Sequence, residues 1–125
     1  MVLVVDAANV VGARPDGWWR DRAGASARLV DRLSRALESG TLAAPVLVVL
    51  EGAARAGVPE GEPRAGLRVA HAPRDGDSAI AASVRELVAA GSPVTLVTAD
   101  RALRTDATTS GASVLGPSWL LDRLP

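Results

Sequence analysis

The stretch Val2-Leu3-Val4-Val5-Asp6 decides the fold. Its four apolar residues in a row are typical of a strand that is buried on both faces of a parallel sheet, and the run stops at an acidic residue. Two later stretches have the same character, and two shorter ones complete the set. We therefore predict strands at Val2–Val5, Val46–Leu50, Leu67–Ala70, Val94–Thr98 and Ser113–Leu115.

Helical segments separate most of these strands. From about Arg20 to Ser39 the apolar residues recur on one helical face, and Gly40 stands where a C-cap glycine belongs. A second helix is expected to run from Asp75 or Asp77, either of which can cap it, to about Ala90. Further helices are expected over about ten residues after Asp100 and over a short segment that opens at Pro117.

The alternation of strands and helices predicts a parallel sheet with helices on both faces. Two segments are interpreted as loops because they hold glycine, proline and charged residues: the one that follows Asp6, and residues 52–66, with a short helical turn at Ala53–Ala56. The chain has 125 residues, which is the size of one ordinary domain. We therefore expect one α/β domain over residues 1–125.

The composition excludes several classes of protein. Cysteine is absent, so disulfides, thiolate metal sites and cysteine nucleophiles are ruled out, and the single His71 rules out a multi-histidine zinc centre. Fourteen basic and fourteen acidic residues give a formal net charge of zero, so the chain as a whole does not attract nucleic acid. No segment resembles a targeting or membrane sequence, and we expect a cytoplasmic protein without a membrane partner.

Aromatic residues are scarce, and two of the three tryptophans are adjacent. The Trp18–Trp19 pair beside Arg20 and Arg22 is the one place where base stacking and phosphate contact could coexist. The structural alternative is that one tryptophan covers the core and the other covers a helix start.

Acidic residues follow most of the predicted strands. Asp6, Glu51 and Asp100 end three strands, and the loop after the Leu67–Ala70 strand leads to Asp75 and Asp77. The carboxyl ends of parallel strands meet at one edge, which is where such sheets bind ligands. Crowded carboxylates repel one another, and a hard divalent cation such as Mg²⁺ or Mn²⁺ removes that repulsion. Such an ion can orient a phosphodiester and activate a water molecule.

Each acid also has a purely structural alternative. Asp6, Asp77 and Asp100 stand where N-cap and turn residues are common, and capping does not exclude ligation. Glu51 can equally be solvated or paired with an arginine, and Asp75 can be a simple loop residue.

Other polar residues near these acids have two interpretations as well. Asn9, three residues after Asp6, either forms a turn or holds a metal-bound water or a phosphate oxygen. Ser78 orients a carboxylate or continues the helix start. Arg101 and Arg104 meet phosphate or form surface salt bridges. His71 is interpreted as structural or merely exposed.

Four segments, taken in chain order, carry a family resemblance. They are V-V-D-A-A-N-V-V-G at Val4–Gly12, H-A-P-R-D-G-D-S-A-I at His71–Ile80, V-T-L-V-T-A-D-R-A-L-R at Val94–Arg104 and G-A-S-V-L-G-P-S-W-L-L at Gly111–Leu121. Together they resemble the D-x-x-N opening, the acidic helix start, the V-T-[SA]-D-R strand end and the closing strand and helix of NYN domains. These domains are PIN-like ribonucleases, and the resemblance is to their bacterial branch.

The resemblance implies a PIN-like three-layer α/β/α sandwich with parallel strands in the order 3-2-1-4-5. It also implies cleavage of RNA by a metal-dependent endonuclease. Asp6, Asp77 and Asp100 match the family's metal-binding acids, and Asn9 matches the polar partner in the first motif. Arg101 would lie beside the site.

Two departures from the family pattern concern the site itself. Ser78 stands where an acid would make the cluster more negative, and Ala8 replaces an aromatic or bulky residue before the motif's asparagine. Both departures are compatible with a weakened or altered activity.

The predicted function is therefore a Mg²⁺- or Mn²⁺-dependent endoribonuclease. Asp6, Asn9, Asp77 and Asp100 would be catalytic, the three aspartates would bind the metal, and the substrate would contact Ser78, Arg101 and Arg104. The alternatives are a non-catalytic RNA- or ribosome-binding module and a nucleotide pyrophosphohydrolase. Association with the ribosome and formation of a homodimer stay open at this point.

Overall fold

A central sheet of six strands organises the molecule, which is described here from a computed structural model covering all 125 residues. Five strands are mutually parallel: β1 (Val2–Asp6), β2 (Val46–Leu50), β4 (Leu67–His71), β5 (Val94–Val97) and β6 (Ser113–Leu115). Their spatial order is β4-β2-β1-β5-β6, which is the predicted order 3-2-1-4-5 of the parallel strands. A sixth strand, β3 (Gly61–Arg64), pairs antiparallel with β4 at the edge of the sheet.

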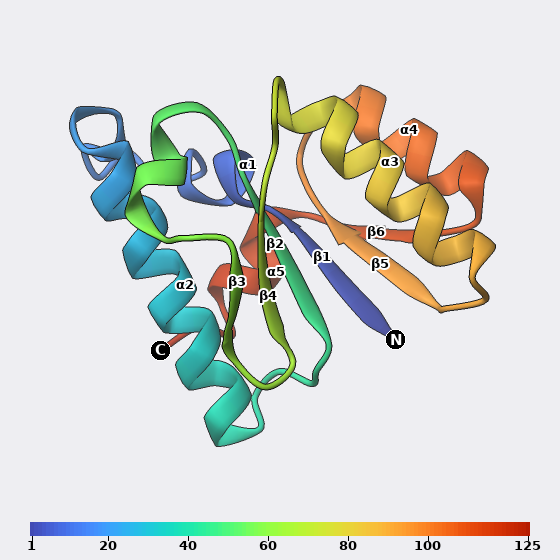
Figure 1. Ribbon diagram of the computed structural model, residues 1–125, viewed down its shortest axis with the longest axis horizontal. Helices are drawn as coiled ribbons and strands as arrows, with labels where there is room; N and C mark the ends of the chain where they lie inside the picture. The colour runs from blue at the N-terminus through green and yellow to red at the C-terminus, as the bar shows by residue number, and fades with distance from the viewer.

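Helices cover both faces of the sheet (Figure 1). Three helices lie on one side, namely α1 (Ala7–Val11), α2 (Arg22–Ser39) and α5 (Pro117–Leu121). The other side carries α3 (Gly76–Ala89) and α4 (Arg101–Ser110). Two short 3₁₀ helices pack against α2: η1 (Trp18–Arg20), which precedes it in the chain, and η2 (Gly52–Gly57), which follows β2. The expected three-layer α/β/α sandwich with a central parallel sheet is confirmed.

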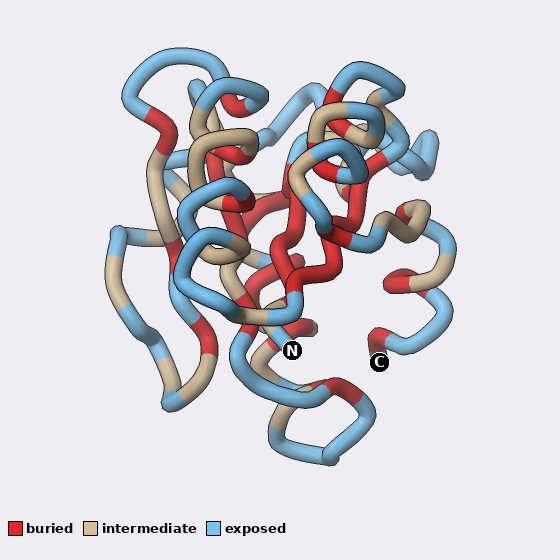
Figure 2. Tube along the Cα trace, turned by 90° about the vertical axis from the view of Figure 1, so that its right-hand side faces the viewer, coloured by how far each residue is buried: buried red, intermediate tan, exposed pale blue.

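The strands are continuously apolar because each side of the sheet has its own core. Leu3 and Val5 of β1 belong to the cluster with α1, α2 and α5, whereas Val4 between them belongs to the cluster with α3 and α4. Successive side chains of a strand point to opposite faces, so burial on both faces requires an apolar residue at every position. The buried parts of the trace gather along these central strands, and the outer turns of the helices are exposed (Figure 2).

Two segments predicted as loops contain regular structure. The first five residues after Asp6 form α1, because Ala7 and Val10 turn inward while the Asp6 carboxylate caps the helix. Residues 52–66 hold η2, which includes the expected turn at Ala53–Ala56, and strand β3. The sequence of β3, G-E-P-R, suggests a turn, but an edge strand tolerates proline since one side of its backbone has no partner.

One close approach fixes η2 against α2. A Cβ on Gly57 would lie 2.0 Å from the carbonyl oxygen of Ala23, so only glycine allows the two backbones to approach this closely. The buried Ser26 hydroxyl, on α2, lies 2.7 Å from the Ala54 carbonyl oxygen and donates a hydrogen bond to it. This contact places the end of β2 beside the start of α2.

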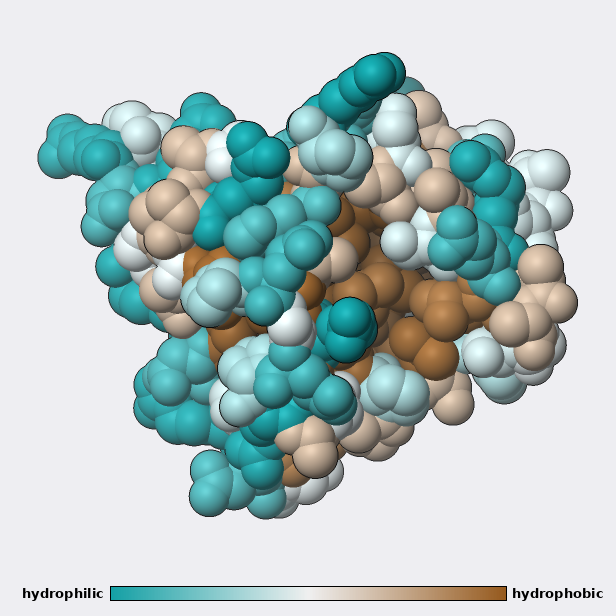
Figure 3. Space-filling model, viewed as in Figure 1, coloured by the Kyte–Doolittle hydropathy of each residue, from teal (hydrophilic) through white to brown (hydrophobic).

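On the face of the sheet covered by α3 and α4, some apolar side chains stay partly exposed. Between β4 and α3 the space-filling view shows an apolar hollow (Figure 3), on the side where Val2, Leu47 and Leu87 are only partly buried. None of the helices combines the length and the apolar character that crossing a membrane requires.

Candidate functional site

The carboxyl ends of the central strands meet the starts of three helices at one edge of the sheet. Asp6 is the last residue of β1 and the N-cap of α1, Glu51 follows β2, and Asp100 follows β5 as the N-cap of α4. Asp75 and Asp77 stand at the start of α3, which packs against β1 and β2. We call these five residues the acidic edge.

Asp6 is the buried member of the acidic edge, with only 3% of its surface exposed. Its Oδ2 accepts hydrogen bonds from the Thr98 hydroxyl at 2.7 Å and from the Asn9 side-chain amide at 2.8 Å. No basic side chain forms an ion pair with it. Burial therefore raises the pKa of Asp6 above its ordinary value, although the hydrogen bonds from Thr98 and Asn9 act in the opposite direction.

Thr98 connects two acids, and the sequence analysis did not select it. Its hydroxyl donates to Asp6 and also accepts a hydrogen bond from the backbone N–H of Asp100 at 3.1 Å. The Thr98 residue is completely buried. The sequence does contain a signal for Thr98: it is a hydroxyl residue that directly follows an apolar strand and stands two positions before an acid.

Asp100 is tied to its own helix. Asp100 is the N-cap of α4: its Oδ1 accepts a hydrogen bond from the N–H of Leu103 at 2.9 Å. Its other carboxylate oxygen has no hydrogen-bond partner. The Arg104 side chain donates a hydrogen bond to the Thr98 carbonyl oxygen at 3.0 Å, so it helps to hold the backbone between Thr98 and Asp100. Arg101 is exposed and has neither a hydrogen bond nor an ion pair.

Two acids hold the start of α3. Asp75 caps the helix by accepting from the Ser78 N–H at 2.7 Å, and Glu51 accepts from the Gly76 N–H at 2.6 Å. These contacts satisfy two of the N–H groups that every helix start leaves without a partner. The bonds from Ser78 lower the pKa of Asp75. A Cβ on Gly76 would lie 2.7 Å from the Glu51 carboxylate, so a larger residue there would displace that side chain from the helix start.

Asp77 is the one acid of the acidic edge that has no partner. It lies in the first turn of α3, is exposed, and makes no hydrogen bond or ion pair. Its pKa is raised, first by partial burial and then by the negative charges of Asp100, Asp6, Glu51 and Asp75. The other four members of the acidic edge therefore all act electrostatically on this one carboxylate.

The donor set suits a hard divalent cation, but the side chains are not gathered tightly around one point. Carboxylate, amide and hydroxyl oxygens are the groups that Mg²⁺ and Mn²⁺ prefer, and the mutual repulsion felt by Asp77 is what such an ion relieves. As the side chains stand, however, no three acidic or histidine residues lie close enough together to hold an ion directly. An ion at this edge would therefore keep several waters between itself and the protein, as Mg²⁺ commonly does.

The remaining predicted residues take the following positions. Asn9 lies in α1 rather than in a turn, and its amide orients Asp6. Ser78 bonds Asp75 instead of the neighbouring Asp77. Glu51 is neither merely solvated nor paired with an arginine, since it holds the start of α3. The structural interpretation of His71 is confirmed, because its ring lies 2.7 Å from the Val58 carbonyl oxygen and bonds to it.

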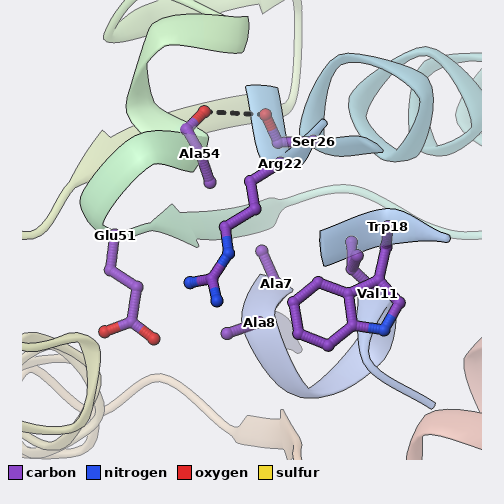
Figure 4. Close-up of a pocket in the computed structure, with 8 residues that line it drawn as sticks. All are labelled: Ala7, Ala8, Val11, Trp18, Arg22, Ser26, Glu51 and Ala54. Carbon is purple, nitrogen blue, oxygen red and sulfur yellow. Dashed lines mark hydrogen bonds between the residues drawn. The ribbon is translucent and has the colours of Figure 1, made fainter. Parts of the chain in front are cut away.

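A hollow opens beside the acidic edge, on the side of α1 and α2 (Figure 4). Glu51 stands at one end of it, and the Arg22 guanidinium reaches in between Glu51 and the Trp18 ring. Its lining residues are Ala7, Ala8, Val11, Trp18, Arg22, Ser26, Glu51 and Ala54.

Comparisons with known proteins place the fold. No protein-family model matches the sequence, and no curated protein matches it. Among solved structures, Rae1 (YacP) from Bacillus subtilis superposes with a TM-score of 0.73 at 17% sequence identity, over 98% of this chain and 72% of its own. A point mutant of Rae1 gives the same TM-score at 18% identity, over 97% and 72%. At this level of identity the likeness establishes the shared fold alone.

Proposed function

We propose that this chain is a metal-dependent endoribonuclease that hydrolyses phosphodiester bonds of RNA in the cytoplasm, with the acidic edge as its active site. The observation that carries the proposal is the gathering of five carboxylates, from four separate parts of the chain, at the ligand-binding edge of a parallel sheet. The sequence resemblance to NYN domains supports it, since Asp6, Asn9, Asp77 and Asp100 match that family's motifs.

The proposed chemistry begins with the charge of the site. RNA is an anion, and an uncompensated cluster of carboxylates would repel it. A Mg²⁺ or Mn²⁺ ion held by Asp6, Asp77 and Asp100, partly through water, would supply the positive charge that orients the phosphodiester and activates the attacking water.

The chain's own residues then have distinct tasks. Thr98 and Asn9 fix the Asp6 carboxylate in one orientation. Asp77, which is exposed and makes no hydrogen bond or ion pair, would be free to hold the ion, directly or through water. Arg101 is free to contact a phosphate group of the substrate, whereas Arg104 is occupied by the Thr98 carbonyl oxygen.

The direct test is cleavage of labelled single-stranded and structured RNA with Mn²⁺, Mg²⁺ or EDTA. We expect cleavage that depends on the metal and falls by at least about a hundredfold in Asp6→Asn and Asp77→Asn, because losing a ligand costs more than losing its supporting partner. Asp122→Asn is the matched control, since Asp122 is exposed and lies after α5, outside the acidic edge. Equal cleavage by wild type and Asp6→Asn would refute the proposal.

One observation favours a second candidate function. Because no three acids lie close enough to hold an ion directly, the chain could be a non-catalytic module that binds RNA, for example on the ribosome. RNA binding without turnover in either metal would support that candidate. Turnover of free nucleotides, with RNA left intact, would instead indicate a pyrophosphohydrolase.

A further inference from the structure

The hollow beside the acidic edge shares residues with the proposed active site. Ala7 and Ala8 line the hollow and lie between Asp6 and Asn9 in the chain, and Glu51 belongs to both. A group bound in this hollow would therefore lie directly next to a phosphodiester at the acidic edge.

The tryptophans of this region do not serve the core. Among partly buried residues, Trp119 packs against the main apolar cluster, whereas neither Trp18 nor Trp19 does. Trp19 is 51% exposed, and Trp18 meets it edge to face with the ring centroids 6.0 Å apart. The structural alternative had one tryptophan covering the core and the other covering a helix start, and its first half is not what the structure shows. An aromatic wall that faces a hollow needs another explanation.

The polar groups of the hollow complement one another. The Arg22 guanidinium lies 5.3 Å from the centre of the Trp18 ring, and it makes neither a hydrogen bond nor an ion pair. It can only donate hydrogen bonds, whereas the Glu51 carboxylate opposite can only accept them (Figure 4). The rest of the lining is apolar except for Ser26, whose hydroxyl is already bonded to the Ala54 carbonyl oxygen.

These features match one chemical class. A nucleobase has a flat apolar face and an edge that carries both donors and acceptors. The hollow has a volume of about 50 Å³, which is room for about four waters at roughly 10–15 Å³ each, so it accepts part of one planar ring rather than a folded helix or strand. Stacking on an aromatic side chain works for any base, because every base has a π-face.

A second, basic hollow continues the same surface. Val11 lines both hollows, and the second one is also lined by Arg14, Arg28 and Arg32, with Asp16 as its single acid. Arg14 and Arg28 are exposed and have neither a hydrogen bond nor an ion pair. In a chain of net charge zero this is a local excess of positive charge, which favours an anionic ligand.

Both hollows are lined in part by α2. Arg22, Arg28 and Arg32 all belong to this helix, and at 1.5 Å per residue they span about 15 Å along its axis. Arg28 and Arg32, four residues apart, share one face of α2 beyond the aromatic hollow, which suits phosphates connected to a bound base.

We propose that α2 and η1 form a binding site for single-stranded RNA, in which one base enters the hollow against Trp18 and adjoining phosphates contact Arg14 and Arg28. The inference rests on the proposed function, since it describes how the same active site would receive its substrate. It selects single-stranded over duplex RNA, because a paired and stacked base cannot present its face to Trp18.

The test is equilibrium binding of a fluorescent single-stranded RNA decamer, measured by anisotropy in EDTA so that no cleavage occurs. We expect Trp18→Ala to weaken binding by about tenfold or more, in line with the loss of one stacked base. Trp19→Ala, which removes the neighbouring ring, should change binding less than about twofold. If Trp18→Ala does not fold, Trp18→Leu decides the same question, because leucine keeps apolar bulk without a ring to stack on.

Salt dependence tests the phosphate contacts separately. Arg28→Gln should reduce the slope of log affinity against log salt by about 0.7, the value for one phosphate of a single strand. Arg35→Gln is the matched control on the same helix, since Arg35 is already paired with Asp31, and it should leave the slope unchanged.

Three results would overturn the inference: unchanged binding in Trp18→Ala, an equal loss in Trp19→Ala, or competition by duplex RNA as strong as by single-stranded RNA. Failure of the nuclease proposal is distinguishable from these outcomes. Trp18-dependent binding in EDTA without any cleavage in Mn²⁺ would refute the nuclease proposal and leave the binding site in place.

Discussion

Asp6→Asn should make the protein more stable at neutral pH in the absence of divalent cations. The carboxylate is 3% exposed and has no ion-pair partner, so its charge is buried without an opposite charge beside it. An asparagine oxygen at the place of Oδ2 can accept the same hydrogen bonds from Thr98 and Asn9. The substitution would lose only the longer bond from the Asn9 N–H to Oδ1, at 3.4 Å.

The expected gain is about 1 kcal/mol in the free energy of unfolding. Removing a buried charge relieves a penalty of several kcal/mol, most of which the two short hydrogen bonds already offset, and the lost 3.4 Å bond contributes less than about 1 kcal/mol. For a domain of this size, 1 kcal/mol corresponds to a rise in Tm of about 4 °C.

The direction in which stability changes with pH follows from the raised pKa of Asp6. The folded state binds this proton more tightly than the unfolded state, so the charge of Asp6 destabilises the fold above the folded-state pKa. Acidification removes that penalty. The stability difference between Asp6→Asn and wild type should therefore shrink as the pH falls from neutral towards the ordinary aspartate pKa of 3.8.

The assay is thermal denaturation in EDTA at neutral and at acidic pH, with Asp122→Asn as control. We expect no change in the control within about 0.5 kcal/mol, as is usual for surface positions. A lower Tm for Asp6→Asn than for wild type at neutral pH would refute the reasoning, because it would mean that the Asp6 charge stabilises the fold.

Three further predictions concern the hydrogen bonds, charges and packing around the acidic edge. Thr98→Val should cost about 1–3 kcal/mol of stability in chemical denaturation, since two hydrogen-bonded groups lose their buried partner; an unchanged midpoint would contradict the bridging role. Asp100→Asn should lower the pKa of Asp77 in an NMR titration, because the Asp100 charge helps to raise it, and a pKa that stays the same would show that the two carboxylates do not interact. Gly57→Ala should destabilise the fold by about 1–3 kcal/mol through the clash of η2 with α2, whereas Gly116→Ala, with open space around its Cβ position, should be nearly neutral.

The sheet could be predicted from the sequence because burial on both faces leaves a simple signature. Val2–Val5 and Val46–Leu50 are apolar at every position, and no other element of a domain this size needs that pattern. The glycine at Gly40 marked the end of α2, and the structure indeed places it there in the left-handed conformation.

The missed elements lack such a signature. α1 has five residues, too few for a helical period to be visible, and it is held by the cap that Asp6 supplies. β3 exists because β4 offers an edge to pair with, which is a tertiary condition that its own glycine and proline do not reveal.

The acids of the site were predictable, but their partners were not. Asp6, Asp77 and Asp100 each stand at a strand end or a helix start, which the sequence shows directly. The bond from Thr98 to Asp6 joins residues 92 positions apart, and the bond from Gly76 to Glu51 joins residues 25 positions apart. Contacts of this kind depend on strand order and register, so they become visible only in the folded chain.

Whether the acidic edge holds a divalent cation is tested most directly by anomalous diffraction from a crystal soaked in Mn²⁺. We predict a single strong anomalous peak among Asp6, Asp77 and Asp100, with at least one carboxylate oxygen at about 2.2 Å and waters in the remaining positions. An edge without any peak, in a crystal where Mn²⁺ is bound elsewhere, would contradict the account.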